Sequence, residues 1–150
     1  MFRFNLQQVL DFRRQREEKM ELELAEARRV MEREQERLAF FRDRQAHYQR
    51  ELAERQRQGM ETAEAALYSA YIRFLREKIE WQMEAVETAR KQVETKKEEV
   101  LAARMDRKVL DRLRSRRHRA FLEDTRREET RRLDEVALGR FEARLRDRRG

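Results

Sequence analysis

Proline is absent from the 150 residues of this chain, and glycine occurs only once among the first 138. Because these two residues most often interrupt helices, their scarcity predicts long uninterrupted helices. Charged residues make up 46% of the chain and hydrophobic residues 39%, which is typical of amphipathic helices rather than of a compact mixed domain. We therefore expect an all-α protein whose helices each bury one apolar stripe.

The first helix is expected to begin near Leu6. Asn5 is a good N-cap residue, Gln8 follows it at the spacing of a capping box, and Phe4 can pack on Val9 as a hydrophobic staple. A 4,3 spacing then runs through fourteen positions, ten of them apolar: Leu6, Leu10, Arg13, Glu17, Met20, Leu24, Ala27, Met31, Glu34, Leu38, Phe41, Gln45, Tyr48 and Leu52. Such a repeat predicts a helical partner along the whole helix.

A second repeat follows in a different phase. It has ten apolar residues in thirteen positions: Tyr68, Ile72, Leu75, Ile79, Gln82, Val86, Ala89, Val93, Lys96, Val100, Ala103, Arg107 and Leu110. Between the two repeats, Gly59 can adopt the positive φ that ends a helix, and Thr62 can cap the next one. The alternative is one unbroken helix in a parallel dimer, with Gly59 a weak spot that costs about 1 kcal/mol.

We predict an antiparallel coiled-coil hairpin, with helix 1 at residues 6–57, a turn at 58–62 and helix 2 at 63–145, forming a single elongated domain over residues 1–150. Paired positions then have numbers that add to about 119, so Leu6 lies opposite about Arg112. Everything beyond residue 113 is expected to overhang helix 1.

The overhang combines positive charge with a late apolar stripe. Of the formal net charge of +7, +5 lies in residues 111–150, which have 14 basic and 9 acidic residues. Leu133, Val136, Ala137 and Phe141 recur at helical spacing and have no internal partner. We interpret them as a docking segment; the alternative is a frayed tail.

Seven of the twelve aromatic residues lie between residues 40 and 81. Tyr71, Phe74, Lys78 and Trp81 form a stripe beside the expected seam, which a two-helix hairpin cannot cover. Exposed aromatic stripes often mark binding sites for other proteins. The alternative is a locally thickened seam or a dimer contact.

A basic cluster occupies Arg114, Arg116, Arg117, His118 and Arg119. Acidic residues follow at once, and no aromatic residues are interleaved for base stacking, so we favour a solvated helix face and predict no nucleic-acid partner.

No motif indicates catalysis. His47 and His118 stand alone on charged stretches, cysteine is absent, and there is no phosphate-binding glycine loop. We expect no catalytic residues, no cofactor and no metal site. Apolar runs reach only four residues and the start shows no signal peptide, so we expect a cytoplasmic protein without membrane insertion.

Three segments resemble the bacterial flagellar export protein family FliJ: Phe2 to Arg13, "RMDRKVLDRLRSRR" from Arg104, and "RRLDEVALGRF" from Arg131. The resemblance implies an antiparallel two-helix coiled coil similar to the central stalk of rotary ATPases. It further implies a monomeric, non-catalytic component of the flagellar type III export apparatus, peripheral at the inner-membrane base of the flagellum.

The family's partners are implied by the same resemblance. They are the export ATPase hexamer, the cytoplasmic domain of the export gate membrane protein, and export chaperones with which the protein exchanges. Tyr71 and Leu75 resemble the family's gate-contacting pair. The expected gate surface comprises Phe41, Tyr48, Tyr71, Phe74, Leu75 and Trp81, and the expected ATPase surface comprises Phe2, Phe4, Leu133, Val136, Ala137 and Phe141. A generic coiled-coil tether or scaffold is the alternative.

Overall fold

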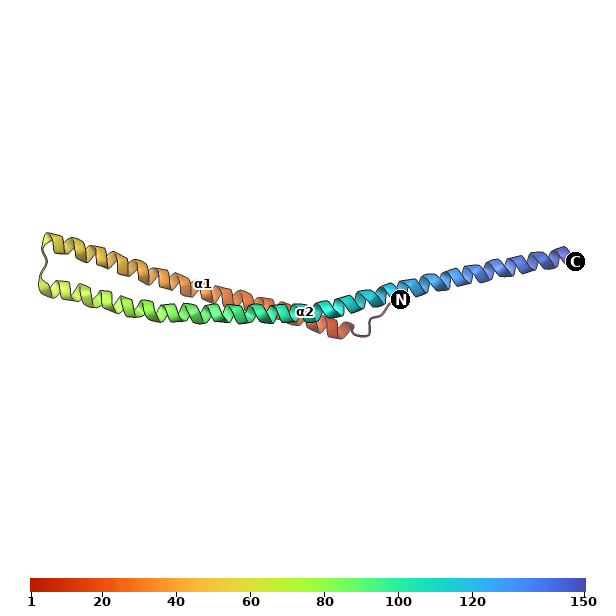
Figure 1. The fold of residues 1–150 in the computed structure, drawn as a ribbon, viewed down its shortest axis with the longest axis horizontal. Coiled ribbons are helices and arrows are strands. Elements are labelled where there is room, and N and C mark those ends of the chain that lie inside the picture. Colours follow the sequence, from red (N-terminus) through yellow and green to blue (C-terminus); the bar gives the residue numbers. More distant parts are fainter. The chain divides into compact units, whose positions relative to one another are not determined.

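The computed structural model of the chain describes residues 1–150. It contains two helices and no strand: α1, Gln7–Gln58, has 52 residues, and α2, Thr62–Arg149, has 88 (Figure 1). The predicted all-α helical hairpin is confirmed. Contacts divide the chain into a hairpin unit, Arg16–Ala103, and a terminal unit, Met1–Gln15 with Arg104–Gly150.

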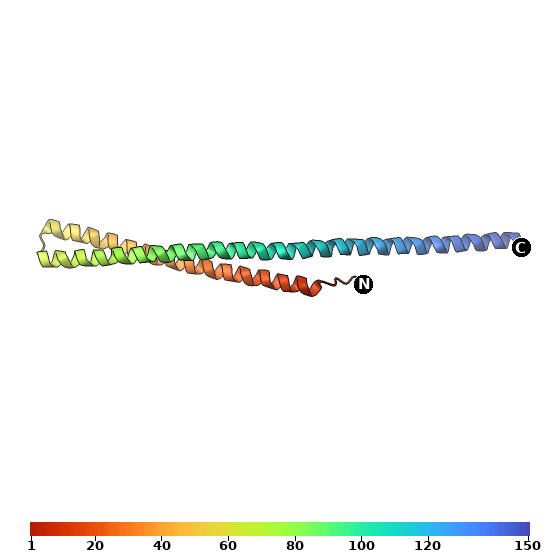
Figure 2. The same ribbon diagram turned by 60° about the horizontal axis from the view of Figure 1, so that its bottom comes forward.

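In the hairpin unit, α1 and α2 run side by side in opposite directions and meet at the turn (Figures 1 and 2). Lys96 Nζ donates to Glu23 Oε2 at 3.1 Å, and the Tyr68 hydroxyl donates to Glu51 Oε1 at 3.0 Å. Both pairs have residue numbers that add to 119, which is the predicted register.

The seam of the hairpin unit is mostly apolar. Leu24, Ala27, Val93 and Val100 form a buried cluster, against which Met20 and Met31 pack. These residues occupy the 4,3 positions of the two repeats, so periodicity alone predicted their burial.

Polar residues also occur in this seam, and Gln82 with Glu34 is one such pair. Gln82 is buried, and its Nε2 donates to the Glu34 backbone carbonyl at 2.9 Å and also to the Glu34 carboxylate. Sliding one helix past the other would separate Gln82 from Glu34 and leave the buried amide without a partner. A buried amide without a partner lowers stability. The pair therefore favours this one register over shifted ones.

The turn is made by Gly59, Met60 and Glu61. Gly59 has a φ of +97°, so the predicted role of this glycine is confirmed. The prediction for Thr62 was wrong, because α2 already includes it. The Glu61 carbonyl accepts the first helical hydrogen bond from Ala65 N at 3.0 Å, so Glu61 takes the N-cap position.

In the terminal unit, Phe4, Leu10 and Leu110 form a buried cluster. The predicted staple is wrong: Val9 is 41% exposed, whereas the Phe4 ring is 7% exposed and belongs to this cluster. Burial against α2 removes more apolar surface from water than a contact within α1, so the tertiary contact prevails.

The residues before α1 lie along α2 in a non-helical conformation. The Phe2 ring contacts the His118 ring at 4.8 Å and the Phe121 ring at 5.7 Å, while Arg117 Nη1 donates to Asn5 Oδ1. Asn5 thus pairs with Arg117, a contact that the predicted capping box did not include. An extended chain advances about 3.3 Å per residue and a helix about 1.5 Å. The few residues before α1 therefore cover α2 as far as Phe121, beyond residue 113, where the overhang past helix 1 was predicted to begin.

Candidate partner-binding surfaces

Rings from both helices of the hairpin unit share one side of the seam near the turn. We call this surface the aromatic face; it comprises Phe40, Phe41, Tyr48, Tyr71, Phe74 and Trp81, with Arg44 and Lys78 among the rings. Tyr48 and Tyr71 join the two helices edge to face at 4.9 Å, and the Tyr71 and Phe74 rings stack at 6.1 Å. Their mutual contacts restrict the rings before any partner arrives.

Several of these rings are open to solvent. Phe40 is 55% exposed, Phe74 49% and Trp81 69%, whereas Phe41, Tyr48 and Tyr71 are half-buried. Side chains of this size at such exposure are typical of protein-binding surfaces.

Leu75 does not belong to the aromatic face. It is 1% exposed and lies in the seam, so the predicted gate contact through its side chain is wrong. Its position in the second 4,3 repeat gave the correct signal, because positions of that repeat face the partner helix.

The two cations of the aromatic face are held by the rings. Arg44 Nε donates to the Tyr71 hydroxyl at 3.0 Å, and its guanidinium carbon lies 5.5 Å from the Phe40 ring centroid. That hydrogen bond raises the pKa of Arg44, so the side chain stays charged. Lys78 Nζ lies 5.5 Å from the Phe74 centroid and 5.3 Å from the Trp81 centroid. Both distances fit cation–π contacts.

Two of the shallow hollows beside these rings are lined by cations. The first has about 100 Å³ and is lined by Phe74, Glu77, Lys78 and Trp81. The second has about 530 Å³ and is lined by Arg33, Glu36, Arg37, Phe40 and Phe41. Each hollow combines apolar ring surface with at least one cation.

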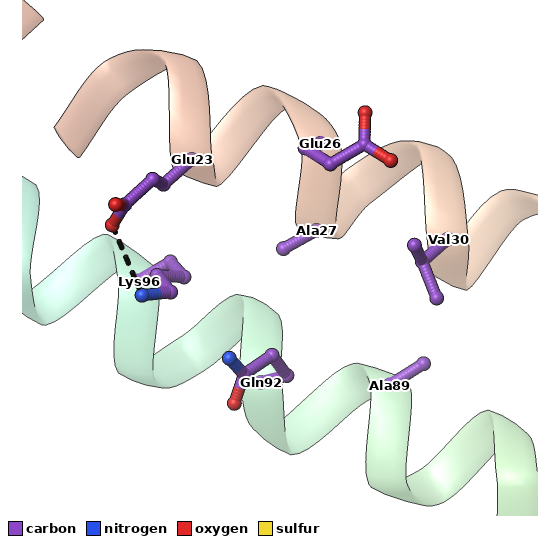
Figure 3. Close-up of a pocket in the computed structure, with 7 residues that line it drawn as sticks. All are labelled: Glu23, Glu26, Ala27, Val30, Ala89, Gln92 and Lys96. Atoms are coloured by element: carbon purple, nitrogen blue, oxygen red, sulfur yellow. Dashed lines mark hydrogen bonds and ion pairs between the residues drawn. The ribbon is translucent and has the colours of Figure 1, made fainter. Parts of the chain in front are cut away.

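A separate groove of about 290 Å³ opens over the seam where both helices carry alanine (Figure 3). Ala27 and Ala89 form its floor, and Glu23 and Lys96 are bonded across one end. Hydrogen bonds to Glu23 and Glu99 raise the pKa of Lys96 and keep it charged. The groove exists because small side chains on both helices leave space that larger ones would fill.

The basic cluster on α2 binds the start of the chain. Arg114 Nε donates to Gln7 Oε1 at 3.0 Å, and the Arg117 guanidinium lies 5.6 Å from the Phe4 centroid. Together with His118, these side chains recur at positions i, i+3 and i+4, so one side of α2 receives the N-terminal segment. The buried Phe4 is therefore part of the core of the terminal unit, which corrects its assignment to the ATPase surface.

Beyond Phe121, every residue of α2 is exposed. Leu133 is 70% exposed, Val136 52% and Phe141 60%, so the predicted docking residues are open to solvent, as is Ala137. Leu138 and Leu145, at 59% and 41%, extend this stripe and were missed. Their helical spacing from Phe141 was a signal that could have identified them. We call these six residues the tail stripe.

No group of three or more His, Cys, Asp or Glu residues is arranged to hold a metal ion. Neither helix contains a stretch apolar enough and long enough to cross a bilayer.

The chain was compared with known proteins. A sequence model of the flagellar FliJ protein family matches residues 2–146. A solved structure of CT670 from Chlamydia trachomatis, described as a YscO homologue, has a TM-score of 0.66 and 25% identity, with all of both chains covered. No curated protein sequence matched the chain.

Fold and comparisons together define a helical-hairpin component of type III protein export. The match covers nearly the whole chain, and the chain belongs to the FliJ family, whose members are non-enzymatic components of flagellar export. The resemblance of the three segments is thereby confirmed.

Proposed function

We propose that the chain is a central-stalk-like coiled coil that links the flagellar export ATPase ring to the membrane export gate and exchanges with export chaperones. It acts as a monomer on the cytoplasmic side of the inner membrane at the base of the flagellum. The observation that carries the proposal is the presence of two separate exposed apolar surfaces, the aromatic face and the tail stripe. A generic coiled-coil tether would need only the buried seam.

The aromatic face is assigned to the cytoplasmic domain of the export gate protein. Its exposed rings supply large contact area, and their mutual contacts limit the side-chain entropy lost on binding. Tyr71, Phe74 and Trp81 carry the predicted contact, with Phe41 and Tyr48 beside them. Leu75 is part of the buried seam and makes no exposed surface for the gate protein.

The tail stripe is assigned to the export ATPase hexamer. An amphipathic helix without an internal partner can bury Leu133, Val136, Ala137 and Phe141 in a groove of another protein. Phe2 is half-buried on His118 and Phe121 and can contribute the edge of its ring. Phe4 cannot take part because it is buried.

Binding of the purified chain to each partner tests both assignments. Deleting Leu122 to Gly150 spares the residues that hold the N-terminal segment, and it should abolish ATPase binding while leaving gate binding unchanged. The double variant Tyr71→Ala, Phe74→Ala should abolish gate binding and leave ATPase binding unchanged. Light scattering should give the mass of a monomer.

Two results would contradict the proposal. One is wild-type affinity for the ATPase after the deletion. The other is equal gate affinity for wild type and the Tyr71→Ala, Phe74→Ala double variant. A dimeric mass together with no binding to either partner would favour the generic tether.

A further inference from the structure

We infer that the aromatic face recognises an acidic segment of its protein partner, with carboxylates received by Arg37, Arg44 and Lys78 and a large apolar side chain seated beside Trp81. The inference rests on the proposed function, because it gives the chemistry of the partner at the surface assigned there. It is carried by cations that lie beside exposed rings and have no carboxylate partner in the chain.

No carboxylate of the chain pairs with these three cations. Lys78 lies over the Phe74 and Trp81 rings, and Arg44 bonds to Tyr71 and lies over Phe40. Arg37 lines its hollow without an ion pair. Elsewhere in the hairpin unit some cations have carboxylate partners, as Arg90 does with Glu87 at 2.6 Å, and others such as Arg76 do not. The cations of this face differ from both groups because they lie beside aromatic rings.

The rings place these charges for binding. Lys78 Nζ lies within 5.5 Å of two ring centroids, so the ammonium group is held in position while its remaining hydrogens can still donate. The only carboxylates that line the two hollows are Glu36 and Glu77. An acidic partner segment would thus gain charge-assisted hydrogen bonds next to apolar contact.

Nucleic acid fits the same face less well. Base stacking needs free ring faces, whereas Lys78 lies over both Phe74 and Trp81, and Phe74 also stacks on Tyr71 with an interplanar angle of 23°. Three cations would also neutralise few phosphates. An acidic protein segment needs neither a free ring face nor a long run of cations.

Trp81 is the only tryptophan, so its fluorescence reports on this face alone. The full-length chain would be titrated with two helical peptides that lack tryptophan, one of leucine and glutamate and one of leucine and lysine. We expect the acidic peptide to shift the Trp81 emission to shorter wavelength, and the shift should saturate as peptide is added. The affinity should fall at high salt. The basic peptide should give no saturable shift.

Charge variants give the matched comparison. Lys78→Glu and Arg37→Glu should each weaken binding of the acidic peptide about tenfold, the effect of losing one charge-assisted contact and adding repulsion. Lys78→Met removes the charge without adding repulsion, so its affinity for the acidic peptide should lie between those of wild type and Lys78→Glu. Arg76→Glu is the control, because Arg76 is exposed on α2 on the other side of the buried Leu75 and should not change the affinity.

The inference is overturned if the two peptides bind equally, or if Arg76→Glu weakens binding as much as Lys78→Glu. It is also overturned if oligo(dT) or anionic phosphatidylglycerol vesicles shift the emission and the acidic peptide does not. Saturable binding of the acidic peptide without binding of the gate domain would retain the inference and reject the gate assignment. Gate binding that is insensitive to salt and to Lys78→Glu would retain the gate assignment and reject the inference.

Discussion

Gly59 and Gly139 should respond to alanine in opposite directions. Gly59 has a φ of +97° and a Cβ there would meet no atom within 4 Å, so the cost of Gly59→Ala is purely conformational. We expect a loss of about 1 kcal/mol in the free energy of unfolding. Gly139 lies within the exposed part of α2, where alanine should raise helix stability by about 0.5–1 kcal/mol.

Urea unfolding followed by circular dichroism measures the first change, and amide exchange around residue 139 measures the second. Asparagine tolerates positive φ better than alanine, so Gly59→Asn should cost less than Gly59→Ala. Equal stability of wild type and Gly59→Ala would mean that the turn can adopt another conformation at no cost.

Asp111 gives the terminal unit a pH dependence. Partial burial alone would raise the pKa of Asp111, but hydrogen bonds from Arg107 at 2.7 Å and Arg14 at 3.0 Å prevail and lower it below the usual 3.8. A lowered folded-state pKa means that the stabilisation is fully present above pH 3.8 and is lost as the pH falls through the folded value.

Asp111→Asn should therefore reduce stability by about 0.5–1 kcal/mol at pH 6, since the carboxylate is partly exposed. The difference between wild type and variant should shrink below pH 3.8. Thermal unfolding of both proteins across this range checks the prediction. A difference that stays constant with pH would mean that the aspartate charge is not responsible.

At the scale of elements, the N-terminal segment should depend on Phe4 and not on Val9. Phe4→Ala empties part of a buried cluster and should destabilise the terminal unit by about 3 kcal/mol. Val9→Ala removes an exposed side chain and should change stability by less than about 0.5 kcal/mol. Hydrogen exchange of residues 104–121 should accelerate in Phe4→Ala only. Similar exchange in both variants would argue for the staple within α1.

The sequence predicted the two helices, their register and the turn because each depends on a repeated signal. Many 4,3 positions specify the seam together, so four polar exceptions in the first repeat do not obscure it. The role of a single side chain is indicated by one position only, so no other position can correct a misleading signal. Asn5 and Thr62 carried local capping signals, but the carbonyls that accept the first helical hydrogen bonds belong to Leu6 and Glu61.

The sequence predicted part of the candidate surfaces, namely the residues that the repeat pattern places outside the seam. Trp81 and Phe141 lie off the seam pattern, and both are exposed as expected. Phe4 and Leu75 were assigned by resemblance or by position near a terminus, neither of which reports burial. The N-terminal contact with Phe121 depends on an extended chain reaching along a helix, which no helical period describes.

At the scale of the whole protein, core and surface variants should affect motility differently. Leu75→Ala creates a cavity in the seam and should cost about 2–5 kcal/mol. Its motility defect should therefore worsen on warming, as the folded fraction falls. Tyr71→Ala with Phe74→Ala removes only side chains of the aromatic face, so the proposed gate contact should be lost at every temperature.

Swimming assays at low and high growth temperature, with the amount of protein measured in parallel, separate the two cases. The surface variant should be present at wild-type level with impaired export, whereas Leu75→Ala should lose protein and export together and recover both on cooling. Normal export in the surface variant would contradict the gate assignment. If Leu75→Ala still impairs export when the protein is present at wild-type level, Leu75 must contact the gate protein directly. A residue that acts only through stability cannot impair export once the protein is folded.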